Sequence, residues 1–201
     1  MRSIAFILCV FLTFAISLQI PILKSRELLC LVLSCIIGAG VTSLSKYKIL
    51  DFDKVTVKWI YNAFILGLLY GCIKFYAKYY ILDHVMGSSK ETDIKNFIET
   101  LTFIVIIIPL LEEFFFRGIL FDDIKRMLGN KAAILLTSIL FITLHIKNFS
   151  INPMHESVLL MLPGVFIYVH LKLKTNNFLV SYVAHLTHNL TVFLFLLFLA
   201  R

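Results

Sequence analysis

Ionisable and amide side chains stand inside apolar stretches of this sequence, where segments that face lipid would carry none. Six of them have the types and spacing that could do chemistry: Glu112, Glu113, Arg117, His145, His185 and Asn189. Such groups are costly inside a membrane and usually mark a functional interior. Carboxylates and imidazoles can transfer protons or bind a metal ion, so these residues predict a catalytic or metal site.

The first group is the carboxylate pair in "PLLEEFFFRGILF", residues 109–121. Glu113 and Arg117 are four residues apart, so they share a helix face and can form an ion pair. Glu112 points about 100° away from Glu113 on the same helix. Two neighbouring carboxyls with different partners suit a general base beside a structural acid. The alternative is an intramembrane ion pair that only fixes helix packing.

The second group lies in "HLTHN", residues 185–189. His185 and Asn189 are four residues apart and face the same way, whereas His188 lies on a neighbouring face. A single histidine in a membrane helix often makes only a hydrogen bond between helices. Together with the carboxylates, these side chains offer either metal ligands or a metal-free cluster that activates water.

Depth in the membrane tests whether these groups can meet. At about 1.5 Å of rise per residue, counted from the near end of each apolar stretch, Glu112 lies roughly 14 Å deep and His185 roughly 11 Å deep. The same count puts His145 roughly 20 Å deep. Glu112 and His185 can therefore meet, whereas His145 reaches them only if its helix is tilted or begins below the membrane surface.

The elements that position these residues are predicted to be membrane helices. The chain has 201 residues, 60% of them hydrophobic and 15% charged, and a mean hydropathy of +0.92. We therefore expect one all-α domain over residues 1–201, a polytopic transmembrane helical bundle of about seven spans, within a range of six to eight. The predicted spans are Ile4–Ile22, Leu28–Leu44, Trp59 to about Lys74, Phe97–Phe121, Ala132–Ile146, Val158–Leu171 and Phe178–Ala200.

Charge and cysteine content narrow the class of partner. The net charge of +7 is spread over the predicted loops without a basic stripe, so we expect contact with an anionic lipid surface and no nucleic acid. The loops predicted on the N-terminal side of the membrane carry ten Lys and Arg residues, and those on the other side carry eight. This difference favours a cytoplasmic N-terminus. The first stretch is read as a retained helix, with a cleaved signal peptide as the alternative. The four cysteines form no CxxC pair and read as small buried hydrophobes.

Three motifs appear in order on successive apolar stretches. "EEFFFR" fits EExxxR at Glu112, Glu113 and Arg117, "FITLH" fits FxxxH at Phe141 and His145, and "HLTHN" fits HxxxN at His185 and Asn189. In this order the chain resembles the CAAX protease and bacteriocin-processing (CPBP, or Abi) family of intramembrane endopeptidases. The resemblance covers residues 97–200, which would carry the catalytic core.

The resemblance implies an endopeptidase whose site lies within the membrane. Glu112 with His145 would activate the attacking water, His185 and Asn189 would stabilise the oxyanion, and Glu113 with Arg117 would support the first glutamate. No cofactor is required by this reading. A divalent metal such as zinc, held by Glu112, His145 and His185, is the alternative, and we favour metal-independent chemistry because asparagine is a poor zinc ligand and a good oxyanion donor.

The expected substrates are peptides or membrane-associated proteins, including prenylated proteins of the CAAX type. A role in bacteriocin processing or self-immunity follows from the same resemblance, and we expect a multi-pass protein of a bacterial plasma membrane rather than of the endoplasmic reticulum. A second hypothesis is a membrane immunity or scaffold protein that binds without cutting. A proton or ion pathway is a third, because acidic and histidine side chains can relay protons.

Overall fold

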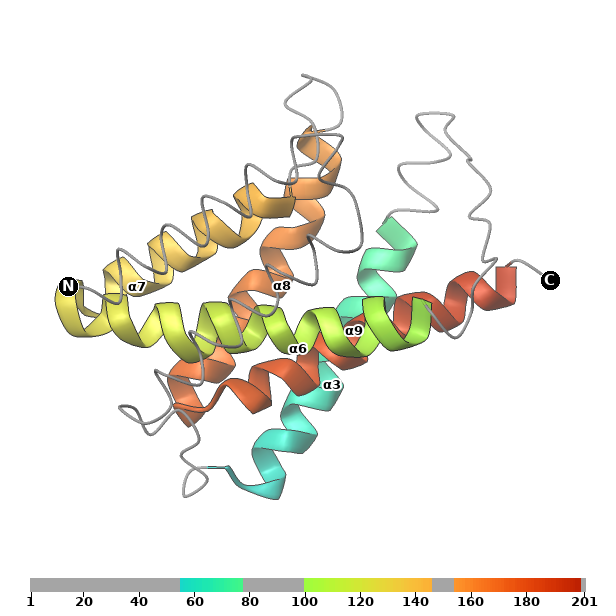
Figure 1. Ribbon diagram of the computed structural model, residues 1–201. Coiled ribbons are helices and arrows are strands. Elements are labelled where there is room, and N and C mark those ends of the chain that lie inside the picture. The colour runs from blue at the N-terminus through green and yellow to red at the C-terminus, as the bar shows by residue number, and fades with distance from the viewer. Residues whose placement is uncertain (1–54, 78–99, 146–153, 200–201) are drawn as a thin grey trace.

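The computed structural model describes residues 55–77, 100–145 and 154–199, and every element in these ranges is a helix (Figure 1). The helices, in chain order, are α3 (Val57–Tyr76), η3 (Thr100–Ile107), α6 (Ile108–Glu113), η4 (Phe114–Leu120), α7 (Phe121–His145), α8 (Met154–Thr175) and α9 (Phe178–Leu199). The predicted all-α class is thus confirmed for this part of the chain. The first two predicted spans lie outside the described residues, so the total of about seven spans stays a prediction.

Two of the described helices are long and apolar enough to cross a membrane, by length and composition. They are α3, over Val57–Tyr76, and the part of α9 over Phe178–Phe198. Both agree with spans predicted from the sequence, and α8 is longer than its predicted span. Many of the large apolar side chains on α3 and α9 are exposed, including Ile73 and Phe198, as helices that face lipid require.

One continuous helical segment carries the glutamates. It begins in the π-helical turns of η3, becomes α-helical at Ile108, and is π-helical again in η4 before α7 begins. Pro109 lies at the first change, where its missing N–H leaves one backbone hydrogen bond unmade. π-Helical turns inside α-helices occur frequently at functional sites, and η4 contains Arg117.

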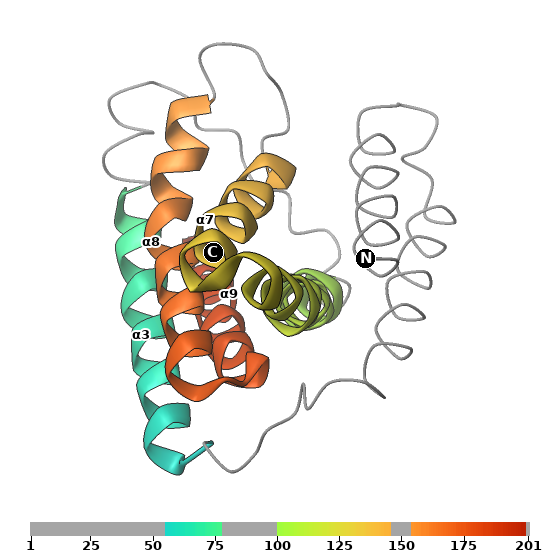
Figure 2. The same cartoon turned by 90° about the vertical axis from the view of Figure 1, so that its left-hand side faces the viewer.

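The helix that holds Glu112 runs past its predicted end at Phe121 and turns only at Gly129. The residue there has φ 85° and ψ 174°, a backbone conformation that glycine alone adopts readily. Beyond Gly129 the second part of α7 returns alongside the first and diverges from it (Figures 1 and 2). The predicted loop over residues 122–131 is thus wrong for most of its length, because no helix-breaking residue precedes Gly129.

The turn at Gly129 changes the reference point for the position of His145. Glu113 is sixteen residues before Gly129 and His145 is sixteen residues after it, so the two residues are the same number of residues from the turn. The expected depth mismatch arose because the sequence-based count began at Phe121 for one helix and at Ala132 for the other. The side chain of His145 itself lies outside the described residues.

α8 and α9 are joined by a tight turn whose polar groups are paired. Asn176 adopts the left-handed conformation at φ 52°, and its N–H donates to the carbonyl of Lys172 at 2.8 Å, which ends α8. Oδ1 of Asn177 then accepts the N–H of Leu179 at 2.9 Å and caps the start of α9. The turn therefore fixes where α9 begins, and with it the position of the histidines about two and three turns later.

Lys172 was expected in a loop, and the structure instead buries it in the last turn of α8. Its Nζ lies 2.9 Å from Oδ2 of Asp122, which lies in the first turn of α7. A buried ammonium requires such a partner, because an unpaired buried charge is strongly destabilising. The ion pair ties α8 to the helix that carries the glutamates.

α9 is the central helix of the described part and packs against α3, α8, η3, α6 and η4. Its contact with α3 is close, because a Cβ added at Gly67 would come within 2.3 Å of the carbonyl oxygen of Ala184. Small residues allow membrane helices to approach in this way. In Figure 2, α3 and α8 lie together, and the helical segment that precedes α7 lies on the other side of the bundle, while α7 itself contacts α8.

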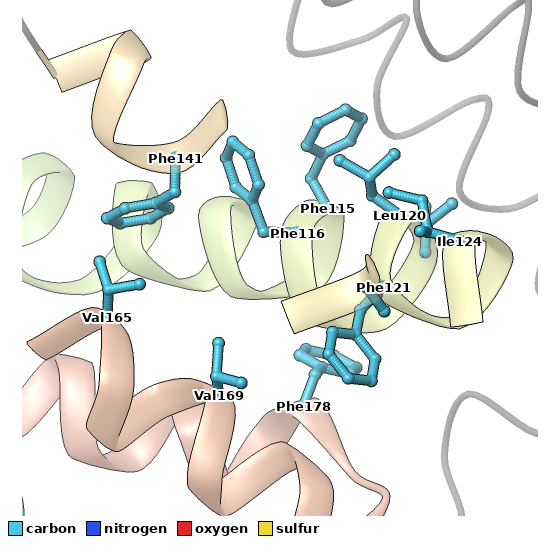
Figure 3. Packing of buried hydrophobic residues seen from close by; sticks show 11 residues of the cluster. Phe115, Phe116, Leu120, Phe121, Ile124, Phe141, Val165, Val169 and Phe178 are labelled. Carbon is cyan, nitrogen blue, oxygen red and sulfur yellow. The ribbon is translucent and has the colours of Figure 1, made fainter. Parts of the chain in front are cut away.

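A largely aromatic core joins these two sides (Figure 3). Phe116 of the long helix packs edge-on against Phe141 of α7, with ring centroids 5.1 Å apart, and Phe178 of α9 contacts Phe114 in the same manner at 5.4 Å. Aromatic pairs of this geometry stabilise a core beyond the area that they bury. The packing holds the motif-bearing parts of η4, α7 and α9 beside one another.

Candidate active site

A buried ionic cluster links the first and third motifs. Oε1 of Glu113 lies 3.2 Å from a guanidinium nitrogen of Arg117, as the four-residue spacing predicted. The same oxygen lies 3.1 Å from Nδ1 of His185 on α9. Glu113 and Arg117 are fully buried. Because a carboxylate paired with a guanidinium can only accept hydrogen bonds, Nδ1 of His185 donates here.

Aromatic rings enclose the guanidinium of Arg117. Its central carbon lies 4.4 Å from the ring centroid of Phe141 and 5.6 Å from that of Tyr168. Cation–π contacts of this kind stabilise a cation most where water is absent. Phe141 is the first residue of the second motif, so the cluster also brings that motif to the first and third.

Glu112 lies apart from this cluster, as its position on the helix predicted. Its side chain is 22% exposed, whereas that of Glu113 is fully buried, and its Oε2 lies 3.9 Å from Nε2 of His185. This separation is too long for a direct hydrogen bond and short enough for one water molecule to contact both atoms. The two carboxylates therefore meet opposite ring nitrogens of one histidine.

Glu112 and His185 open into a cavity of about 240 Å³. The cavity is lined by Tyr70, Lys74, Ile108, Glu112, Phe141, Met161, Gly164, Val165, Tyr168, His185, His188 and Asn189. It combines apolar walls with a few convergent polar groups, which is typical of sites that bind and transform a ligand. Glu112, His185 and Asn189 of the predicted site thus share one cavity, and Glu113 and Arg117 lie behind it.

Tyr168 on α8 contacts both histidines of α9. Its ring stacks on the ring of His185 with centroids 4.6 Å apart and planes 17° apart. Its hydroxyl lies 3.0 Å from Nδ1 of His188 and has no other acceptor among the described residues, so we assign the hydroxyl as the donor. This assignment leaves the proton of His188 on Nε2.

Tyr70 of α3 closes the other side of His188. The two rings are 4.3 Å apart, and the Tyr70 hydroxyl donates to the carbonyl oxygen of Leu160 at 2.5 Å. A Cβ added at Gly164 would lie within 2.5 Å of the Tyr70 ring, so the glycine permits this close approach. α3 and α8 are thereby joined across the cavity wall.

The sequence did not assign these wall residues to the site. Tyr70 and Tyr168 lie on helices without a recognised motif, and Lys74 was named only as the approximate end of a predicted span. His188 was placed on a face next to that of His185, and both faces line the cavity. The one available signal was the density of hydroxyl-bearing aromatics in otherwise apolar helices, because a buried tyrosine hydroxyl usually requires a partner.

His145 ends α7, one turn beyond Phe141, and its side chain lies outside the described residues. A metal ion would need three suitable ligands, and the described residues contain no group of three His, Cys, Asp or Glu side chains that could hold one. The sequence-based metal site includes His145 and so stays a prediction. The bond from Nδ1 of His185 to a carboxylate suits a metal ligand and a metal-free donor equally.

Comparison with known proteins gives one family. Residues 94–191, just under half of the chain, match the family described as "Type II CAAX prenyl endopeptidase Rce1-like". The match contains all three motifs and the whole of η3, α6, η4 and α7. Searches of curated proteins and of solved structures returned no match.

Proposed function

We propose that this chain, whose residues 94–191 match the Rce1-like family of type II CAAX prenyl endopeptidases, is a member of that family and cuts a peptide bond with a water molecule activated by Glu112. The family supports an intramembrane endopeptidase activity in general. The family and the two apolar helices indicate a membrane protein. The roles of individual residues, the substrate and the membrane are our proposals.

The observation that carries this proposal is the separation of 3.9 Å between Oε2 of Glu112 and Nε2 of His185 at the wall of the cavity. A water molecule held between these atoms has a carboxylate on one side to accept its proton. It has an imidazole on the other side, beside the carbonyl that the water attacks. General-base catalysis requires this hydrogen-bond reach between base and water.

The reaction follows from these positions. Glu112 takes a proton from water, and the oxygen forms a bond to the carbonyl carbon while the carbonyl π electrons move to its oxygen. His185, protonated on both nitrogens, donates from Nε2 to this oxyanion, and the amide of Asn189 is the second donor. Preorganised donors of this kind are usually the largest electrostatic contribution to catalysis. The C–N bond then breaks, and the amine leaves with the proton from Glu112.

Glu113 and Arg117 act from behind the cavity. The sequence suggested that they support Glu112. The contact that Glu113 makes with another helix is instead with His185. The carboxylate holds the ring by Nδ1 and offsets the positive charge that Nε2 needs as a donor, and Arg117 forms an ion pair with that carboxylate. We propose that His145 assists Glu112, as the second motif implies.

The proposed substrate is a prenylated peptide or protein that ends in a CAAX sequence, presented from a bacterial plasma membrane. Processing of bacteriocins and self-immunity stay predictions of the sequence resemblance, because no contact in the described residues favours them over another peptide. Apolar walls formed by Ile108, Met161 and Val165 suit a substrate with apolar side chains next to the bond that is cut.

The test is cleavage by the purified full-length protein in liposomes, with a panel of peptides that differ in prenylation and C-terminal sequence. We expect wild type to cut prenylated CAAX peptides and Glu112→Gln to lower kcat about 10²- to 10⁴-fold, as loss of a general base does. Lys131→Gln, which removes an exposed charge at the turn of α7, is the control and should retain full activity.

A chelator added to each reaction separates the two chemistries. Unchanged cleavage supports water activation by Glu112 alone, whereas loss of cleavage that zinc restores would establish a metal held by Glu112, His145 and His185. If wild type cuts no peptide and Glu112→Gln still protects cells from a bacteriocin as well as wild type does, the proposal is wrong. The binding and immunity reading then replaces it.

A further inference from the structure

Lys74 places a positive charge in the wall of the cavity. Apart from the histidines, Glu112 and Lys74 are the two lining residues that carry a full charge, and they come from different helices. A lysine in the last turn of α3 could simply extend to the membrane surface. Its presence in the lining of the same cavity as Glu112 and His185 gives it a second role.

The packing of α3 on α9 puts Lys74 beyond the catalytic groups in one direction. The two helices run in the same direction where they touch: Gly67 of α3 lies against Ala184 of α9, and Gly71, one turn later, lies against Thr191. At the end of this series the rings of Phe75 and Phe195 stack 4.7 Å apart. Lys74 precedes Phe75 by one residue, so its backbone lies past His185, toward the C-terminal half of α9.

A row of side chains connects His185 with this lysine. The ring of His185 lies 6.0 Å from that of His188, which lies 4.3 Å from that of Tyr70. The ammonium of Lys74 lies 5.9 Å from the Tyr70 ring. Lys74 therefore lies on the same cavity wall as His185, and the rings of His188 and Tyr70 form the contacts between them.

We propose that Lys74 binds the C-terminal carboxylate of the substrate, on the C-terminal side of the bond that is cut. This inference rests on the proposed function, because it needs a scissile carbonyl at His185 and Asn189. It also sets the direction of the peptide: its prenylated side lies away from α3, and its free C-terminus lies between α3 and α9. The enzyme thereby selects peptides that end shortly after the cleavage site.

The charges of the site support this direction. Glu112 repels an anionic group placed next to it, whereas Lys74, on a different helix of the cavity wall, attracts one. An ammonium carries three N–H donors, so it can contact a carboxylate and keep another partner. A hydrogen bond between two charged groups is stronger than one between neutral groups, and more so in an apolar cavity.

The test compares two prenylated peptides that differ only in ending with a carboxylate or with an amide. We expect wild type to cut the acid with a kcat/KM at least about tenfold higher than the amide, as loss of a charged hydrogen bond predicts. Lys74→Met should lower cleavage of the acid far more than cleavage of the amide, so that the preference for the acid is lost. Lys74→Arg should retain the preference. Lys58→Met, an exposed lysine on the same helix, is the matched control.

Equal cleavage of the acid and the amide by wild type would overturn the proposal. A Lys74→Met variant that is less active on both peptides but still prefers the acid would overturn it as well. Binding separates this outcome from failure of the proposed function. Fluorescent acid and amide peptides titrated into Glu112→Gln protein, with and without Lys74→Met, measure recognition of the carboxylate without cleavage. A preference for the acid that depends on Lys74 supports the subsite even where wild type cuts neither peptide.

Discussion

Oε1 of Glu113 lies 3.1 Å from Nδ1 of His185, and this contact joins α6 to α9 at the centre of the described helices. The same oxygen faces the guanidinium of Arg117 at 3.2 Å. The glutamate therefore does two things at once: it neutralises a buried cation, and it orients the histidine whose other nitrogen faces Glu112. This carboxylate contributes both to the stability of the fold and to the proposed catalysis, so its removal should affect both.

Glu113→Gln should destabilise the protein as well as inactivate it. The substitution leaves Arg117 buried without a negative partner, which costs about 3–5 kcal/mol of the free energy of unfolding. Denaturant titration of the protein in detergent measures this loss. The double variant Glu113→Gln with Arg117→Met removes both charges and should recover part of the stability without recovering activity. A single variant as stable as wild type would contradict the ionic cluster.

Tyr168→Phe should separate the two contacts of Tyr168. Phenylalanine keeps the ring that stacks on His185 and loses the hydroxyl that donates to His188, so we expect a loss of about 1–2 kcal/mol in unfolding free energy. Tyr168→Ala also removes the stacked ring and should cost about 3–5 kcal/mol. Thermal unfolding of both variants checks the order. Equal stability of wild type and Tyr168→Phe would show that the hydroxyl contact contributes nothing.

Gly67→Ala should force α3 away from α9. Its Cβ would meet the carbonyl oxygen of Ala184 at 2.3 Å, which requires the helices to separate, and overpacking of this kind costs about 1–3 kcal/mol. Leu69→Ala, at an exposed position on the same helix, is the comparison and should change stability little. Unfolding midpoints of the two variants give the result, and a neutral Gly67→Ala would mean that the contact is looser than the structure shows.

Gly129→Ala should strain the turn inside α7. The glycine has φ 85° and ψ 174°, a region that other residues enter at a cost of about 1–3 kcal/mol. Because the turn sets where the second part of α7 begins, activity should fall together with stability. Asn130→Ala changes the exposed neighbour and serves as the control. Both the unfolding free energy and the cleavage rate are measured. If neither falls, the turn tolerates alanine and the prediction is wrong.

Much of the site could be read from the sequence because the information is local. The spacing of Glu113 and Arg117 allows them to pair on a helix, and the same period puts His185 and Asn189 on one face. Apolar composition likewise predicted the helices α3 and α9 close to their observed bounds. The family follows from motifs of this local kind, in their order along the chain.

The contacts between helices required the tertiary structure. Nothing in the spacing of residues states that Glu113 holds His185, that Tyr168 stacks on it, or that Lys74 reaches the cavity, because each contact depends on how two helices cross. The turn at Gly129 is an intermediate case: a glycine is visible in the sequence, but its positive φ is visible only in the fold. A helix period determines which side chains share a face, whereas packing decides which faces meet.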